Sequence, residues 1–124
     1  MYLASLTPGA IDVEEGLTRL RRSAPEVYWK DLDAYRPTQT AAALTIPMLI
    51  LQGARDYQVT LADLQGWRDA LGGRANVTIK SYPTLNHLFL PGEGKSTPSE
   101  YDRAGHIPDF VLDDIADWIR KIKT

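Results

Sequence analysis

The second half of the chain shows the strand, helix and strand pattern of a parallel sheet. Residues 46–51 form a continuous apolar run with Pro47 near its start and Gly53 after it, which is typical of a strand covered on both faces and predicts a strand over about 46–52. Residues 76–82 alternate apolar and polar side chains and include β-branched ones, which predicts a second strand. Apolar residues at helical spacing over 61–71 lie between them. This order predicts two parallel strands joined by a right-handed crossover, and hence an α/β fold.

Helices are predicted on either side of the second strand. Thr60 followed three residues later by Asp63 is the pattern of a capping box and marks a helix start. After Pro108, apolar residues follow a 3.6-residue period, and acidic residues precede basic ones, which complements the helix dipole. The expected core-facing residues are Leu61, Leu64, Trp67, Ala70 and Leu71 in the first helix, and Val111, Ile115, Trp118, Ile119 and Ile122 in the second.

The remaining segments are less regular. Residues 11–23, 26–35 and 38–44 predict three short helices, the first weakened by Gly16, so that residues 1–44 form a helical segment and residues 45–124 an α/β part. Residues 88–107 contain three glycines and little periodicity, which predicts a long loop. Loops of this length in compact domains are usually functional or mobile.

Composition narrows the functional class. The 124 residues are 44% hydrophobic and 24% charged, as in an ordinary globular domain with one core. The net charge of −2 and the lack of a long basic block argue against nucleic acid, and the Arg19, Arg21 and Arg22 cluster fits a solvated helix face. Without cysteine there is no disulfide or thiolate metal site, and no metal site is predicted. No apolar run spans a bilayer and no signal peptide is evident, so we expect no membrane partner and a cytoplasmic protein.

Two candidate catalytic residues follow the predicted strands. Asp56 comes just after the first strand and His87 just after the second, at the sheet edge where open α/β sheets build their sites. An acid there can orient a histidine, and the histidine can act as a general base. Alternatively, Asp56 caps the loop before the next helix and His87 is a solvated or packed residue. The joint order of strand, acid, helix, strand, histidine and helix favours the catalytic interpretation.

Other motifs carry weaker signals. Tyr28, Trp29 and Tyr57 could line a substrate pocket, although aromatic residues at helical spacing are more often part of a core. Gly94-Lys95-Ser96 lacks the first glycine and the following helix of a phosphate-binding loop, so nucleotide binding is disfavoured and no cofactor is predicted. His106 is interpreted as a loop residue before the last helix.

Several segments resemble the C-terminal end of the α/β-hydrolase family, and in particular bacterial serine hydrolases of the esterase and acyl-peptidase-like type. The resemblance covers roughly residues 26–122 and implies a partial α/β-hydrolase fold in which Asp56 is the triad acid and His87 the triad base. It also implies that the N-terminal residues belong to a cap. The segments that carry it are Tyr28-Trp29-x-Asp31-Leu32, Ile46–Gly53, Arg55–Val59, Tyr82–Phe89 and Gly92–Ser96.

The nucleophile of that family is missing. No G-x-S-x-G occurs in the chain, and no serine has the flanking glycines of the strained turn that exposes a catalytic serine; the serines are Ser5, Ser23, Ser81, Ser96 and Ser99. In such hydrolases the nucleophile and the oxyanion-hole amides precede the part that this chain resembles. An acid and a histidine without an activated hydroxyl cannot form an acyl-enzyme.

The sequence therefore predicts the C-terminal part of a serine hydrolase of small esters or amides, inactive without a serine supplied elsewhere. The alternative is a non-catalytic dimerising or binding module derived from a hydrolase. Because two strands rarely form a stable sheet alone, we expect the bare edge of strand 46–52 to pair with its copy in a homodimer.

Overall fold

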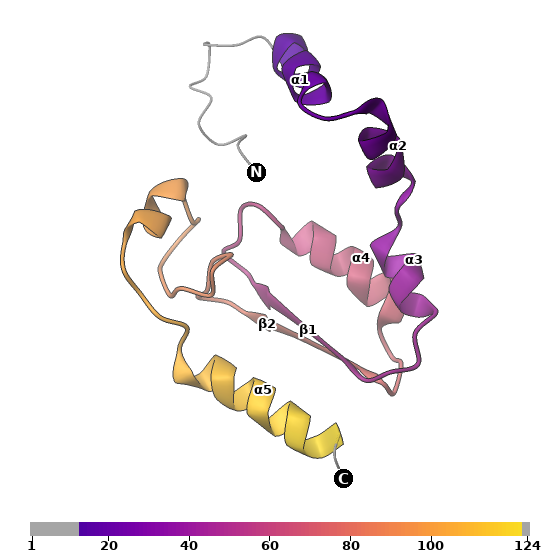
Figure 1. Cartoon of the computed structure of the whole chain (residues 1–124). Helices are drawn as coiled ribbons and strands as arrows, with labels where there is room; N and C mark the ends of the chain where they lie inside the picture. Colours follow the sequence, from indigo (N-terminus) through magenta and orange to yellow (C-terminus); the bar gives the residue numbers. More distant parts are fainter. Residues whose placement is uncertain (1–12, 123–124) are drawn as a thin grey trace. The chain divides into compact units, whose positions relative to one another are not determined.

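The computed structural model describes residues 13–122 (Figure 1). The chain divides into two compact units, Met1–Pro37 and Thr38–Thr124. Some predictions fall outside the described part. They concern Ser5, the N-terminal residues considered for a signal peptide, and Ile11, where the first predicted helix begins. The division at residue 44 and the assignment of residues 1–44 to a cap stay predictions. No helix within residues 13–122 is both long and apolar enough to cross a membrane.

The first unit contains helices α1 (Val13–Arg22) and α2 (Glu26–Ala34), close to their predicted bounds. The indole N–H of Trp29 donates a hydrogen bond to the backbone oxygen of Arg21 (3.0 Å) and so links the two helices. None of the α2 side chains is buried. A short helix, α3 (Pro37–Ala42), begins at the boundary with the second unit.

The second unit is built on two parallel strands, β1 (Met48–Gly53) and β2 (Val77–Tyr82). Their register pairs Met48 with Val77 and Gly53 with Tyr82, so both strands end at the same edge of the sheet. Helix α4 (Leu61–Leu71) connects them. The predicted α/β class, with two parallel strands and flanking helices, is confirmed.

Helices α4 and α5 (Asp109–Ile122) lie on either side of the strand pair (Figure 1). The predicted capping box of α4 is present, with the Asp63 carboxylate accepting hydrogen bonds from the Thr60 N–H (2.7 Å) and hydroxyl (2.9 Å). Helix α5 is fixed to β2 through Asp114, which accepts a hydrogen bond from the Tyr82 hydroxyl (2.9 Å) and pairs with Lys80. The core on this side consists of Tyr82, Leu85 and Val111, with Leu51, Phe89 and Ile115 packed against them.

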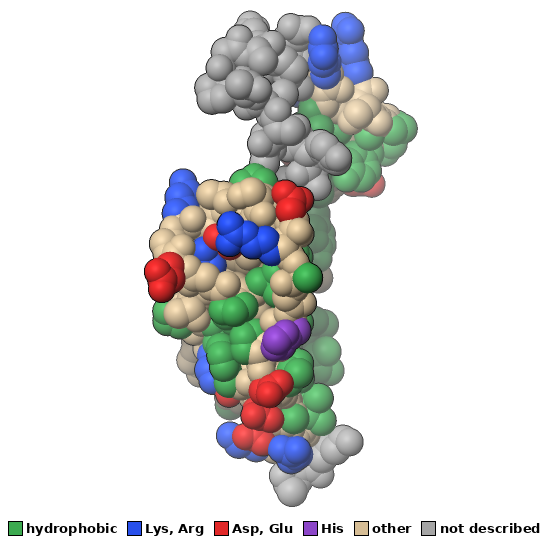
Figure 2. Space-filling view, turned by 90° about the vertical axis from the view of Figure 1, so that its left-hand side faces the viewer, with side chains coloured by type: hydrophobic (Ala, Val, Ile, Leu, Met, Phe, Trp, Pro, Cys, Tyr) green, Lys and Arg blue, Asp and Glu red, His purple; other side chains and the backbone are tan. Residues whose placement is uncertain are grey.

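The predicted apolar stripes are only partly buried. Leu64, Leu71 and Val111 lie in the interior, whereas Leu61 is 49% exposed and Ile122 45% exposed. Strand β1 is half-buried along most of its length instead of fully covered. Two strands about 5 Å apart are narrower than one helix with its side chains, so they cannot cover a whole helix face. Apolar side chains also reach the surface among charged ones on the face drawn in Figure 2.

The stretch 88–107 contains more structure than predicted. Leu85 and Pro91 form an isolated antiparallel bridge, and the Gly92 N–H donates to the Thr84 oxygen (2.9 Å), which closes residues 84–92 into a small hairpin. A 3₁₀ helix, η1 (Pro98–Asp102), follows. Periodicity did not reveal these elements because neither is long enough to repeat an apolar pattern.

Candidate active site

The backbone brings the two strand ends together and continues their pairing into the loops. The Ala54 N–H donates to the Tyr82 oxygen and the Arg55 N–H to the Leu85 oxygen, both at 2.9 Å. A side chain on Gly53 would place its Cβ 2.3 Å from the Asn86 oxygen and 2.6 Å from the Leu85 oxygen. Glycine therefore allows the loop after β2 to lie directly against the end of β1.

Asp56 and His87 form a hydrogen-bonded pair at this edge. The His87 Nδ1 atom lies 2.7 Å from Asp56 Oδ2. The Asp56 side chain is 4% exposed and the His87 side chain 39% exposed. A carboxylate accepts only, so the hydrogen bond places a proton on Nδ1 and leaves the Nε2 lone pair of a neutral imidazole available. The sequence placed these two residues at neighbouring strand ends, and the structure brings them into contact.

The Asp56 carboxylate is held by the loop that follows it. Its Oδ1 atom accepts hydrogen bonds from the Gln58 N–H (2.8 Å) and the Val59 N–H (2.9 Å), and the Gln52 side-chain amide lies 3.2 Å from Oδ2. Burial alone would raise the pKa of this carboxyl, but the hydrogen bonds from Val59, His87 and Gln58 outweigh it, so the pKa lies below its usual 3.8. Asp56 therefore caps its loop, as the alternative interpretation held, and also contacts the histidine.

This depressed pKa predicts an acid-dependent loss of stability. The unfolded chain takes up the proton near pH 3.8 and the folded chain at lower pH, so the stabilisation is complete above that value and is lost as the pH falls through the folded pKa. In Asp56→Asn, the free energy of unfolding should fall less steeply than in the native chain between about pH 5 and 2. Urea denaturation followed by circular dichroism at several pH values measures this slope.

Asp102 offers the matched control, since its carboxylate is exposed in η1. Asp102→Asn should retain the pH profile of the native chain. Identical slopes for native protein and Asp56→Asn would contradict the assignment of the depressed pKa.

Asn86 organises the turn that carries His87. Its buried side-chain oxygen accepts hydrogen bonds from the Leu88 N–H and the Leu90 N–H, both at 3.0 Å. Its backbone oxygen accepts from the Phe89 N–H, and its own N–H donates to the Leu90 oxygen, also at 3.0 Å each. Phe89 adopts a positive φ of 59° within this turn. The imidazole therefore stands on a closed loop of backbone and amide hydrogen bonds.

A second buried residue, Arg55, directly precedes the acid. Its guanidinium donates to the Gly94 oxygen (2.8 Å) and the Glu93 oxygen (3.0 Å), and it pairs with the Glu100 carboxylate. The Ser96 hydroxyl donates to the Arg55 backbone oxygen. Ser96 is thus buried in a structural hydrogen bond, away from the role of a nucleophile.

The predicted aromatic residues fall in different parts of the chain. Tyr57 follows the acid and stacks on Tyr101 of η1, with ring centroids 5.9 Å apart. Tyr28 and Trp29 belong to α2 in the other unit, where their rings meet edge to face at 5.0 Å. Their binding of substrate stays a prediction.

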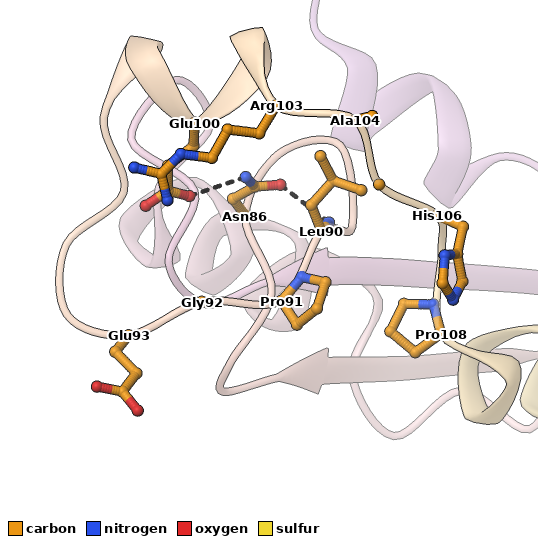
Figure 3. Close-up of a pocket in the computed structure, with 11 residues that line it drawn as sticks. Asn86, Leu90, Pro91, Gly92, Glu93, Glu100, Arg103, Ala104, His106 and Pro108 are labelled. Carbon is orange, nitrogen blue, oxygen red and sulfur yellow. Dashed lines mark hydrogen bonds between the residues drawn. The ribbon is translucent and has the colours of Figure 1, made fainter.

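A hollow of about 590 Å³ opens beside η1, with Asn86, Glu100, Arg103 and His106 among its lining residues (Figure 3). Asp56 and His87 do not line it. His106 is exposed in the segment before α5, as predicted. No group of three or more potential metal ligands occurs within residues 13–122.

Comparison with known proteins gives one relevant match. The chain is 50% identical over 98 residues to Esterase EstD of Thermotoga maritima. The resemblance is to an esterase. The match covers 79% of this chain but only 24% of the esterase, so the chain spans about a quarter of the length of this curated relative. No protein-family model matches the chain, and no solved structure matches it either.

Sequence reasoning assigned no role to the residues that support the pair. Asn86 directly precedes His87, and Arg55 directly precedes Asp56. This position next to a predicted catalytic residue is the sequence feature that could have identified both as supporting residues. Glu100 lies 45 residues from its partner Arg55 in a segment without periodicity, and no local pattern pointed to it.

Proposed function

We propose that this chain is the C-terminal, acid- and base-bearing part of a serine α/β-hydrolase that hydrolyses esters. The hydrogen bond between His87 Nδ1 and Asp56 Oδ2 at the shared end of two parallel strands carries the proposal. The 50% identity to an esterase over 98 residues supports the choice of reaction.

In this proposal the two residues have distinct roles. His87 accepts the proton of a serine hydroxyl at Nε2 as the serine attacks the ester carbonyl, and returns it to the leaving alcohol. Asp56 fixes the Nδ1–H tautomer and stabilises the imidazolium that forms. The serine and the amides that stabilise the oxyanion come from a part of the protein beyond these 124 residues. The same proposal assigns the N-terminal helices to a cap of the hydrolase, and it includes amides as well as esters among the substrates.

A segment exchange tests the function. The matching segment of this chain replaces the corresponding segment of Esterase EstD, and hydrolysis of p-nitrophenyl acetate is measured for the chimaera and for the 124-residue chain alone. We expect turnover by the chimaera and none above background by the chain. Turnover by the chain alone would show that a nucleophile within it has been overlooked. A folded chimaera without turnover would count against the catalytic roles of this segment.

A second candidate is a dimerising module formed through β1. In the described part of the chain β1 pairs with β2 alone, and the large apolar side chains left exposed in the second unit are Leu44, Ile46, Val59, Leu61, Leu88, Ile107, Phe110, Leu112, Ile119 and Ile122. A second copy pairing along residues 46–52 would extend the sheet to four strands and cover part of this surface.

Sedimentation at micromolar concentration tests this dimer. Met48 donates its N–H toward β2, to the Asn76 oxygen, so the N–H of the next residue, Leu49, points to the outer edge. We expect a dimer for the native chain, a monomer for Leu49→Pro, which removes that donor, and a dimer for Leu49→Thr, which keeps it. A compact native monomer would contradict dimerisation.

A further inference from the structure

We propose that η1 is a bracket that holds the acid loop and the base loop at hydrogen-bonding distance, with Glu100 as the positioning residue. The inference rests on the proposed function of Asp56 and His87, and it adds a role for a segment that contacts the residues next to them in the sequence.

Glu100 contacts the neighbours of both catalytic candidates. One carboxylate oxygen pairs with the guanidinium of Arg55, the residue before Asp56. The other accepts a hydrogen bond at 3.0 Å from the side-chain amide of Asn86, the residue before His87. Figure 3 shows the Asn86 amide lying between Glu100 and Leu90. A single carboxylate therefore joins the two loops that carry the acid and the base.

Arg55 and Asn86, the two residues that Glu100 joins, are buried and closely packed, so a displacement of either one should also move its catalytic neighbour. The Arg55 side chain is 5% exposed and Asn86 is fully buried. Gly92 lies against Arg55, since a Cβ there would fall 2.2 Å from a guanidinium nitrogen. Within the described residues, every buried side-chain nitrogen and oxygen has a hydrogen-bond partner. Interiors packed in this way pass a displacement of one group on to its neighbours.

The next residue of η1 adds a second contact with the acid loop. The Tyr101 ring stacks on Tyr57, and its hydroxyl accepts a hydrogen bond from the Gln58 side chain (2.9 Å). Tyr57 and Gln58 directly follow Asp56. Helix η1 thus contacts the residue that precedes Asp56 and the two residues that follow it.

The chemistry of Glu100 suits this place. Arg55 and the Asn86 amide both present N–H donors, and a carboxylate offers an acceptor to each. The isosteric amide of Glu100→Gln has one acceptor and one N–H₂ group, so one of its two contacts becomes donor against donor. The substitution keeps the shape of the side chain and changes only its hydrogen bonding and charge.

The experiment follows the His87 Nδ1 proton by NMR in the 124-residue chain labelled with ¹⁵N-histidine. The chain has two histidines, so His106 supplies an internal reference. In the native chain the His87 Nδ1–H should be hydrogen-bonded and protected from exchange with water. Glu100→Gln should loosen the contact between the two loops and so weaken the hydrogen bond between His87 Nδ1 and Asp56. The exchange of the His87 Nδ1 proton should then be about ten-fold faster, or its signal lost, as expected when a charge-assisted hydrogen bond is broken.

Glu93→Gln is the matched control because it removes the same charge from an exposed side chain that points away from Glu100 and Asn86 (Figure 3). It should leave the His87 signal unchanged. The double variant Asn86→Asp/Glu100→Gln exchanges donor and acceptor and conserves the net charge. Its Asp side chain can still accept from the turn, so the protection of the proton should return to within about two-fold of native.

The outcomes separate this inference from the proposed function. An unprotected His87 proton in the native chain would overturn both. A protected proton that Glu100→Gln leaves unchanged would overturn the bracket and leave the catalytic pair in place. If circular dichroism shows that Glu100→Gln does not fold, the double variant decides: a folded chain with a protected proton supports the bracket, and any other result overturns it.

Discussion

His87→Ala is expected to lower the rate of p-nitrophenyl acetate hydrolysis by the chimaera about 10³-fold or more. In the proposed site the imidazole takes the proton from the serine, because the hydrogen bonds that lower the pKa of Asp56 make its carboxylate a weak base. The loss should appear mainly in kcat, because the imidazole acts on the transferring proton and contributes little to substrate binding. Initial rates over a range of ester concentrations separate kcat from KM.

The chain supplies its own control in the second histidine. His106→Ala should retain the rate of the unsubstituted chimaera, because His106 is exposed in the segment before α5 and the imidazole that pairs with Asp56 is that of His87. Asp56→Asn should also be strongly impaired, since it favours the wrong tautomer of His87. Equal rates for His87→Ala and His106→Ala would show that His87 is not the base.

Gly53→Ala is expected to lower the free energy of unfolding by about 2–3 kcal/mol. The added methyl would meet backbone atoms of Leu85 and Asn86 at 2.3 to 2.9 Å, and backbone held in a hydrogen-bonded loop cannot turn aside as a flexible side chain can. The substitution should also disturb the His87 Nδ1 proton, because the displaced loop carries His87. Urea denaturation followed by circular dichroism measures the stability change.

Gly66→Ala should have the opposite sign. Gly66 lies inside α4, and a Cβ there meets no atom within 4 Å. Alanine in a helix interior is better than glycine by about 0.5–1 kcal/mol, so the free energy of unfolding should rise by that amount. A destabilisation by Gly53→Ala no larger than the experimental error would contradict the close backbone approach.

The sequence was sufficient for the elements whose pattern repeats. Continuous apolarity predicted β1, alternation predicted β2, and Thr60 with Asp63 marked the start of α4. Because parallel strands end at one edge, positions after each strand also predicted that Asp56 and His87 would lie near each other. That inference needed only topology, and the distance of 2.7 Å agrees with it.

The supporting contacts were beyond sequence reasoning because they join segments far apart in the chain. Glu100 contacts Asn86 from 14 residues away and Arg55 from 45 residues away, and the turn that places Asn86 is held by hydrogen bonds to the side chain of Asn86 itself. The degree of burial was also mispredicted, as Leu61 and Ile122 show. Periodicity reveals which face of a helix is apolar, but not how wide the sheet beneath it is.

Phe89 has a backbone conformation that a bulky side chain rarely adopts, with φ at 59°. Its ring nevertheless packs edge to face against Tyr82, with centroids 6.0 Å apart. Core packing and the hydrogen bonds of the Asn86 amide therefore offset the conformational penalty of this turn when the chain folds. A ligand arriving at His87 would find the imidazole already oriented, and little of its binding energy would be needed to order the loop.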